Sequence, residues 1–196
     1  MRALDRRRVL MAPLLAALLL GSAAGAAGFD LDALMSELAA VRFAQATFVE
    51  RRTVAELNRT LESSGRLTYQ APDRFSRETL APHHDKLEVA RNQLTMTRGG
   101  RTRSFALDAT PEAQVFVEAL RGTLSGNRPL LEKLFELRLD GGDGDWTLLM
   151  VPRDARLRGQ VAEMRIGGRG DNIRRVVVTL ADGDRSWMEI EPEVAR

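Results

Sequence analysis

The sequence predicts a single α+β domain built on a large antiparallel sheet. Several short segments alternate apolar and polar residues with a period of two, which is typical of strands with one buried face. Glycine-rich links separate these segments, and two or three amphipathic helical segments interrupt the series. No internal repeat or low-complexity linker divides the chain, and about 170 residues after the N-terminal segment suit one domain.

Two or three helices are expected. Apolar residues recur every three or four positions over residues 30–41, which predicts a helix with one apolar stripe. A second helix is expected from Thr110 to about Gly126, because a capping residue, a proline and an acid open it. A short third helix is expected over residues 129–134.

The remaining chain predicts roughly ten strands in a meander, with the main helical insert after about the sixth. A one-sided sheet of this size needs its apolar face covered, and short helices cover little of it. The sheet therefore either closes on itself or curls into a trough with helices as a lid. Tight turns are expected at the glycine-rich links over residues 98–101, 141–144, 167–171 and 181–184.

Residues 1–27 have the order of a cleaved secretory signal. Arginines at the start precede an apolar run from Val9 to Leu20, and small residues follow. The run is shorter than the roughly 20 residues that span a bilayer as a helix. We therefore expect an exported, periplasmic protein whose mature domain is residues 28–196.

The charge balance argues against nucleic acid as a partner. The chain has 29 basic and 27 acidic residues, and removing the four Arg and one Asp of residues 1–27 leaves 25 and 26. A nearly neutral domain is not suited to a polyanion. Nearly all basic residues are arginine, with Lys86 and Lys133 the only lysines. A GC-rich coding sequence explains this bias, and contact of some arginines with anionic headgroups is the functional alternative.

Residues suited to catalysis or metal binding are few, and we expect neither an enzyme nor a cofactor or metal. The chain has no cysteine, which removes thiol chemistry and a lipid-bearing N-terminal cysteine. The two histidines, His83 and His84, follow a proline and are expected in a solvated loop. The acids at 140, 143 and 145 lack the spacing of a calcium loop, and residues 169–171 read as a turn.

The sequence resembles the outer-membrane lipoprotein carrier (LolA) family over essentially the whole of residues 28–196, since its export signal, size, strand count and helical insert agree with that family. The resemblance rests on a helix followed by the strand Ala46–Arg51, then on the Gly-x-Leu-x-aromatic segment that begins at Gly65. Prolines follow ten residues apart, at Pro72 and Pro82. Family members place an arginine before the first proline and a tryptophan five residues after it. This chain has Ala71 and Arg77 there, which indicates a divergent branch.

The resemblance implies an incomplete antiparallel β-barrel with an N-terminal helix and a helical lid. Its apolar cavity would hold the acyl chains of a lipoprotein or related lipid, taken from an inner-membrane donor to an outer-membrane acceptor by a monomeric carrier. We further expect Arg77 to serve as a polar gate near the cavity mouth, bonded to a lid carbonyl or an anionic headgroup, with a surface arginine on an edge strand as an equal alternative. Candidate cavity residues are Phe48, Leu67, Tyr69, Phe75, Leu94, Met96, Phe116, Val117 and Leu120.

Ordinary core packing remains an equal alternative for each of these side chains. A lipid-sensing regulatory module of the cell envelope on the same fold is the alternative function, and an enzyme ranks third.

Overall fold

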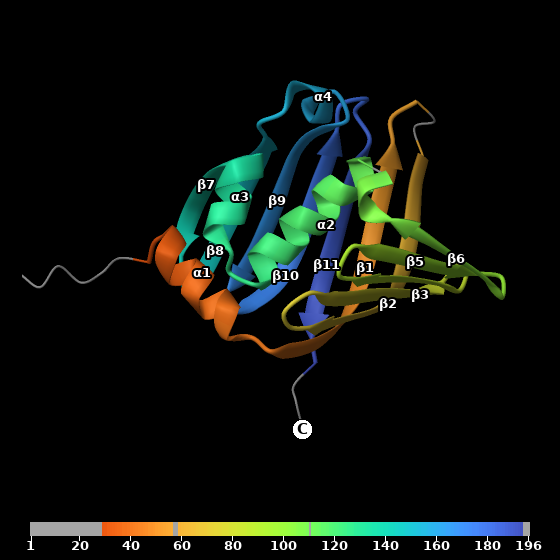
Figure 1. Cartoon of the computed structure of the whole chain (residues 1–196), viewed down its shortest axis with the longest axis horizontal. Helices are drawn as coiled ribbons and strands as arrows, with labels where there is room; N and C mark the ends of the chain where they lie inside the picture. Colours follow the sequence, from red (N-terminus) through yellow and green to blue (C-terminus); the bar gives the residue numbers. More distant parts are fainter. Residues whose placement is uncertain (1–28, 57–58, 110, 194–196) are drawn as a thin grey trace, which may run out of the picture.

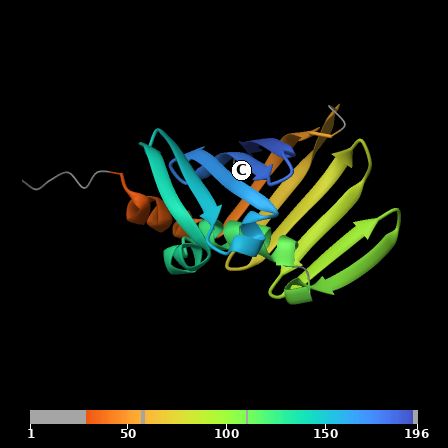
Figure 2. The ribbon, with the colours of Figure 1, turned by 90° about the horizontal axis from the view of Figure 1, so that it is seen from above.

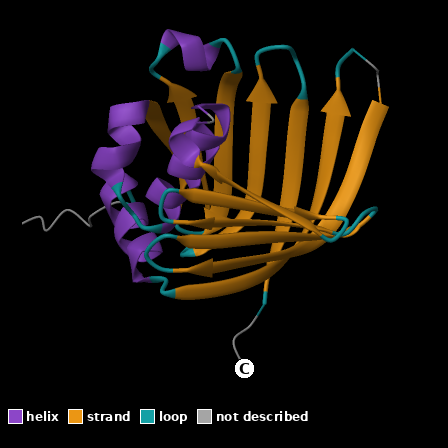
Figure 3. Cartoon of the chain, turned by 45° about the vertical axis from the view of Figure 1, so that its right-hand side comes forward, coloured by secondary structure: helices purple, strands orange, loops and turns teal. Residues whose placement is uncertain are grey.

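A computed structural model describes residues 29–56, 59–109 and 111–193 (Figure 1). One strongly curved antiparallel sheet forms a wall, and the helices gather on its concave side (Figures 2 and 3). The sheet does not close into a barrel, because its first and last strands in space are not paired with each other. The predicted α+β fold with an open half-barrel is therefore confirmed.

The elements follow the predicted order, with eleven strands where about ten were expected. The helical elements are α1 (Leu31–Ala40), the 3₁₀ turn η1 (Leu107–Ala109), α2 (Pro111–Leu124), α3 (Arg128–Leu134) and α4 (Ala155–Arg158). The strands before α2 are β1 (Phe43–Val54), β2 (Arg59–Gln70), β3 (Arg74–Ala81), β4 (Asp85–Ala90), β5 (Gln93–Arg98) and β6 (Arg101–Ala106). Those after α3 are β7 (Phe135–Gly142), β8 (Asp145–Pro152), β9 (Val161–Arg169), β10 (Asn172–Leu180) and β11 (Arg185–Pro192).

The strand order explains why the helical insert crosses the trough. The strands are arranged β6-β5-β4-β3-β2-β1-β11-β10-β9-β8-β7, so the first strand pairs with the last one in the middle of the sheet. The strands on either side of α2 and α3 are therefore the two opposite edges, β6 and β7. The chain has to pass from one edge to the other, and α2 makes this crossing on the concave side (Figure 1).

Local signals fix the ends of α1 and α3. The carboxylate of Asp30 accepts a hydrogen bond from the Ala33 amide at 2.9 Å and so caps α1. Asn127 caps α3 in the same way, with the Leu130 amide as donor at 3.1 Å. Thr110, the predicted cap of α2, lies outside the described residues, as does the predicted signal segment 1–27.

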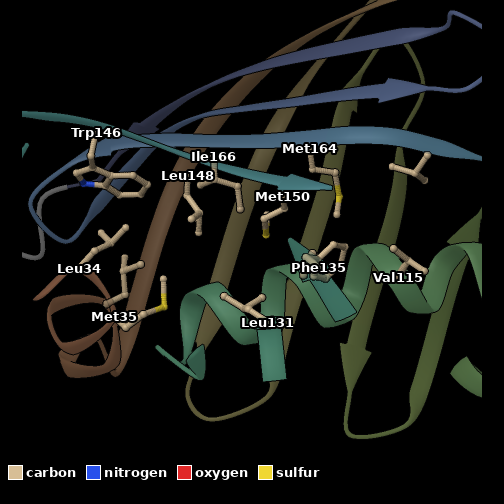
Figure 4. Close-up of a cluster of buried hydrophobic side chains, with 13 residues drawn as sticks. Leu34, Met35, Val115, Leu131, Phe135, Trp146, Leu148, Met150, Met164 and Ile166 are labelled. Carbon is tan, nitrogen blue, oxygen red and sulfur yellow. The ribbon is translucent and has the colours of Figure 1, made fainter. Parts of the chain in front are cut away.

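The main hydrophobic core lies between α1, α2, α3 and strands β7 to β9 (Figure 4). Trp146 of β8 is fully buried there and donates a hydrogen bond from Nε1 to the Gly170 carbonyl oxygen at 2.8 Å. Leu34 of α1 and Leu131 of α3 approach the strands from the helix side and are also fully buried. This core fills one half of the trough. The other half holds two small clusters, one around Phe48 and one around Leu94.

The structure corrects two local predictions. The turn expected over residues 167–171 begins later, because Gly167 and Gly168 are buried inside β9. A Cβ atom on Gly168 would lie 2.6 Å from the Trp146 ring, so this glycine makes room for the tryptophan. The short helix α4, which was not predicted, begins where the Asp154 carboxylate accepts from the Arg156 and Leu157 amides. Across the described ranges, none of the helices has the length and apolarity needed to cross a bilayer.

Candidate functional site: a cavity between helix α2 and the sheet

A cavity of about 570 Å³ lies on the concave side of the sheet, next to the main core. It exists because α1 and α3 fill the trough over β7 to β9, whereas α2 alone spans the middle strands. Most of the lining side chains are apolar, and polar ones gather at the two ends of the strands. The volume lies within the range of about 300–1,000 Å³ that is common for small-ligand sites.

Helix α2 contributes one side of the cavity through a single stripe. Phe116, Leu120 and Leu124 are four residues apart, so they project from the same helix face. All three are half-buried, unlike Ala119 on the adjoining face, which is packed in the main core. The helix thus faces the core with one stripe and the cavity with the next, and Leu38 and Val41 close the side at α1.

Of the nine residues predicted to line the cavity, five lie in its wall: Leu67, Tyr69, Phe75, Phe116 and Leu120. The other four lie outside it. Phe48 is buried in its own cluster with Ala46 and Ile190, and Leu94 in a cluster against which Val117 packs. Met96 is 42% exposed on β5 and is not part of the cavity wall.

The sequence prediction missed the part of the wall that comes from the C-terminal strands. β10 and β11 contribute the lining residues Ile173, Val176, Val178, Leu180, Met188 and Ile190. The alternation of Met188 and Ile190 could have indicated an inward face. In β10 the continuous apolar run Val176–Val178 hides the alternation, because Val177 is buried on the opposite face. Only the pairing of β11 with β1 brings these side chains to the cavity.

A polar network occupies the end of the cavity near the β1–β2 and β10–β11 turns. The Arg77 guanidinium on β3 donates hydrogen bonds to the Glu50 carboxylate on β1 and, at 3.2 Å, to the Ser63 hydroxyl on β2. The Ser186 hydroxyl on β11 donates to the other oxygen of Glu50. These hydrogen bonds link four neighbouring strands, β11, β1, β2 and β3, around the carboxylate of Glu50, whose side chain is 19% exposed.

Arg77 also lies over the aromatic ring of Phe48, with its Cζ atom 4.7 Å from the ring centre. Its three described partners, Glu50, Ser63 and Phe48, all belong to strands, and none belongs to α2. Its Nε atom is buried and has no hydrogen-bond partner among the described residues. Arg77, the predicted gate residue, therefore lines the cavity. Its guanidinium is paired with Glu50 through one nitrogen, whereas its Nε–H group has no described partner.

A second ion pair supports the same end of the cavity. Asp184, buried in the β10–β11 turn, accepts hydrogen bonds from the Ala55 amide at 3.0 Å and from Arg52 at 2.9 Å. These contacts, the backbone amide first, lower the pKa of the Asp184 carboxyl below its ordinary value. The pair joins the β1–β2 and β10–β11 turns and thus fixes the rim of the cavity.

Tyr69 places a phenol in the apolar part of the wall. Its side chain is almost fully buried, and burial raises the pKa of the Tyr69 phenol. Its hydroxyl has no hydrogen-bond partner among the described residues. Because a buried hydroxyl without a partner costs free energy, this atom is suited to bind a polar atom of a ligand.

The other candidates for chemistry lie apart from the cavity. His83 and His84 are exposed, as predicted for a loop, and the Nε2 atom of His84 lies 2.9 Å from a Glu78 oxygen. Asp143 and Asp145 are exposed at the β7–β8 turn. Among residues 29–56, 59–109 and 111–193, no three acidic or histidine side chains come together as a metal-binding group.

Comparison with known families gives a match over most of the chain. Residues 23–188 match the model of a family described as outer membrane lipoprotein carrier protein LolA-like. The chain belongs to this LolA-like family. The match spans the helical insert and extends through β10 into β11. Comparison with curated protein sequences found no match.

Solved structures with a similar chain path have low sequence identity to this member of the LolA-like family. A LolA superfamily protein, NE2245 from Nitrosomonas europaea, is 8% identical with a TM-score of 0.45, covering 83% of this chain and 92% of that one. A chain of the MucA/MucB complex of Pseudomonas aeruginosa is 15% identical with a TM-score of 0.45; the match covers 85% of this chain and 56% of that one. LprF from Mycobacterium bovis is 11% identical with a TM-score of 0.38, covering 82% and 89%.

Proposed function

We propose that this LolA-like protein is a periplasmic carrier that binds the acyl chains of a lipoprotein or related lipid in the cavity under α2. The observation that carries the proposal is the apolar cavity itself, which the helices leave unfilled in the middle of the trough. Exposure of an acyl chain to water costs about 0.8 kcal/mol per methylene, so transport through an aqueous compartment needs such an enclosure.

The polar end of the cavity supports a ligand with a polar head and an apolar tail. The tail would lie against the α2 stripe and the inward faces of β10 and β11. The head would reach Arg77, whose Nε atom is without a described partner, and a polar atom farther along the ligand would reach the Tyr69 hydroxyl. In this arrangement Arg77 acts as the polar gate through the ligand head, while Glu50 holds the guanidinium in place.

The proposed route runs from an inner-membrane donor to an outer-membrane acceptor. The N-terminal segment, with its secretory pattern, supports a periplasmic location for the mature domain. The proposal requires no catalytic step, metal or cofactor, and the carrier acts as a monomer.

Native mass spectrometry of protein purified from periplasm tests the proposal. We expect a co-purifying acyl lipid whose mass identifies the cargo, and we expect Ala44→Phe, which places a ring in the cavity wall, to reduce its occupancy at least about threefold. Ala162→Phe is the matched control, because Ala162 is exposed on β9 and should leave occupancy unchanged. A wild-type protein that never contains lipid would overturn the proposal.

Transfer of the bound lipid to acceptor vesicles separates a carrier from a lipid sensor. A carrier releases its labelled lipid to vesicles on the time scale of minutes, whereas a sensor retains it. Retention without transfer would therefore favour the regulatory alternative.

A further inference from the structure

The hairpin formed by β5 and β6 presents two chemically different faces. On the convex face, Thr95 pairs with Ser104 and Thr97 with Thr102, each through a hydroxyl–hydroxyl hydrogen bond of 3.1 Å. The concave face carries no such pairs. Instead, apolar side chains near the base of the hairpin give way to arginines at its tip.

The strand register defines this concave face. Phe105 lies opposite Leu94, Arg103 opposite Met96, and Arg101 opposite Arg98. Directly opposite residues share one face of an antiparallel sheet, and residues two apart along a strand do as well. We call the exposed members of this set the hairpin patch: Met96, Arg98, Arg101, Arg103 and Phe105.

Exposed apolar groups contribute strongly to the patch. Met96 is 42% exposed and Phe105 is 44% exposed, although their neighbour Leu94 is 8% exposed beneath η1 and α2. Every residue of β6 is exposed, and β6 is an edge strand with β5 as its partner. Two large apolar side chains beside an exposed edge indicate a surface that something covers.

The charge of the patch indicates what covers it. Residues 89–107 contain four arginines and no acid. Within the described part of the chain, Arg98, Arg101 and Arg103 have no ion-pair partner. The nearest acid in the register is Asp85, opposite Arg98 on β4. The turn itself adds no bulk, since Gly99 and Gly100 adopt positive φ and no other group lies within 4 Å of a Cβ at either position.

We propose that the hairpin patch docks this protein on an anionic phospholipid bilayer. Arginines bind lipid phosphates, and the apolar residues next to them enter the boundary between headgroups and acyl chains, which is the arrangement of an interfacial anchor. A protein partner with an acidic surface would satisfy the arginines but would leave no reason for an apolar row that leads away from the tip.

The hairpin patch is connected to the cavity by a row of residues that lie opposite one another on adjacent strands. Across the sheet, Met96 lies opposite Leu87, Leu87 opposite Arg77, and Arg77 opposite Leu67. Leu87, Arg77 and Leu67 all line the cavity. An acyl chain leaving the bilayer at Met96 therefore meets a row of side chains that leads into the cavity. This step rests on the proposed carrier function, whereas the bilayer contact does not.

Vesicle co-sedimentation of the full mature protein tests the docking. One set of vesicles contains phosphatidylcholine alone, and the other contains phosphatidylglycerol and phosphatidylcholine in equal parts. The test variant is R98E/R101E/R103E. The matched control is R59E/R66E/R156E, which makes the same change in net charge at exposed arginines outside the patch that have no described ion pair.

We expect the wild-type protein to partition onto the anionic vesicles and the hairpin variant to lose at least about tenfold of that partitioning. The control should lose clearly less, and M96S/F105S should bind more weakly even at high salt, where charge is screened. Equal losses in the two arginine variants, or equal binding of the wild type to both vesicle types, would overturn the proposal. Unfolding curves confirm that each variant is folded.

The docking and the carrier function fail separately. Native mass spectrometry of the same wild-type samples reports whether the cavity holds lipid, independently of whether the protein binds vesicles. Vesicle binding by a wild-type protein that never holds lipid would overturn the carrier function and leave the docking intact. A wild-type protein that holds lipid but does not bind anionic vesicles would overturn the docking and leave the carrier function intact.

Discussion

The Arg77 guanidinium on β3 reaches across β2 to the Glu50 carboxylate on β1. On its way it lies over the ring of Phe48, 4.7 Å from the ring centre, and passes Gly65, the residue opposite Phe48 on β2. The pair is therefore a link between non-adjacent strands on the floor of the cavity. The same ion pair therefore stabilises the open sheet and holds the guanidinium at the proposed headgroup site.

Loss of this link should weaken both the fold and the lipid complex. In Arg77→Leu the Glu50 carboxylate keeps two hydroxyl donors but loses its cation at a site that is 19% exposed. We expect the free energy of unfolding to fall by about 1–3 kcal/mol in urea titrations at neutral pH. Lipid should also dissociate faster from the variant. Arg66→Leu, at an exposed position on the other face of β2, is the control, and unchanged affinity and release in Arg77→Leu would exclude the gate role.

Gly65 should tolerate no side chain, because the bulge that shifts the β2–β3 register brings the strands very close there. A Cβ atom at Gly65 would approach the Glu78 carbonyl oxygen to 1.9 Å. We expect Gly65→Ala to lower the unfolding free energy by about 2 kcal/mol or more, since two backbones would have to separate. Gly142→Ala is the control, because its Cβ would have no neighbour within 4 Å. Similar denaturation midpoints for the two variants would show that the strands part without cost.

Core and cavity leucines should respond differently to truncation. Leu131 is fully buried in the main core, so Leu131→Ala should lower the unfolding free energy by about 2–5 kcal/mol and leave lipid binding nearly unchanged. Leu120 borders the cavity and is half-buried, so Leu120→Ala should cost about 1 kcal/mol and weaken lipid binding. Urea denaturation and a fluorescent fatty-acid titration measure the two effects. The distinction between core and cavity fails if both leucines affect the same property.

Asp184 should make the stability depend on pH in the acid range. Its pKa is lowered in the folded state, so its contribution is present above the ordinary carboxyl pKa of about 4. That contribution is lost as the pH falls through the folded-state value. Asp184→Asn should therefore reduce stability at neutral pH and flatten its decline below about pH 4. Thermal unfolding between pH 2 and 7 measures both, with Asp145→Asn at an exposed turn as the control; parallel pH profiles for wild type and Asp184→Asn would contradict the assignment.

Local sequence patterns were enough to predict most elements of the fold. The 3.6-residue period predicted α1, the proline start signal predicted α2, and glycine-containing links predicted the β5–β6 and β10–β11 turns, because each depends on residues near one another in the chain. The turn after β9 was placed too early, since Gly167 and Gly168 serve the packing of Trp146 and Arg175 rather than a bend. That role depends on contacts with other strands.

The candidate site was predictable on the motif strands and on the lid helix, where Phe116 and Leu120 line the cavity as expected, but not on the C-terminal strands. Leu67, Tyr69 and Phe75 belong to the motif strands and do line the cavity, whereas Glu50, at the centre of the polar network, showed no distinctive signal in the sequence. Its role appears only when β2 and β3 are in register beside β1.

By itself the sequence determined the class of the fold, the order of its elements and the resemblance to the carrier family. The tertiary structure decided which part of the trough the helices leave unfilled. The pairing of β1 with β11 places the C-terminal strands in the middle of the wall and turns β6 and β7 into opposite edges. The helical insert must then bridge the trough, and a cavity stays open where α2 crosses alone. Such long-range pairing is a property of the whole sheet, so no local pattern specifies it.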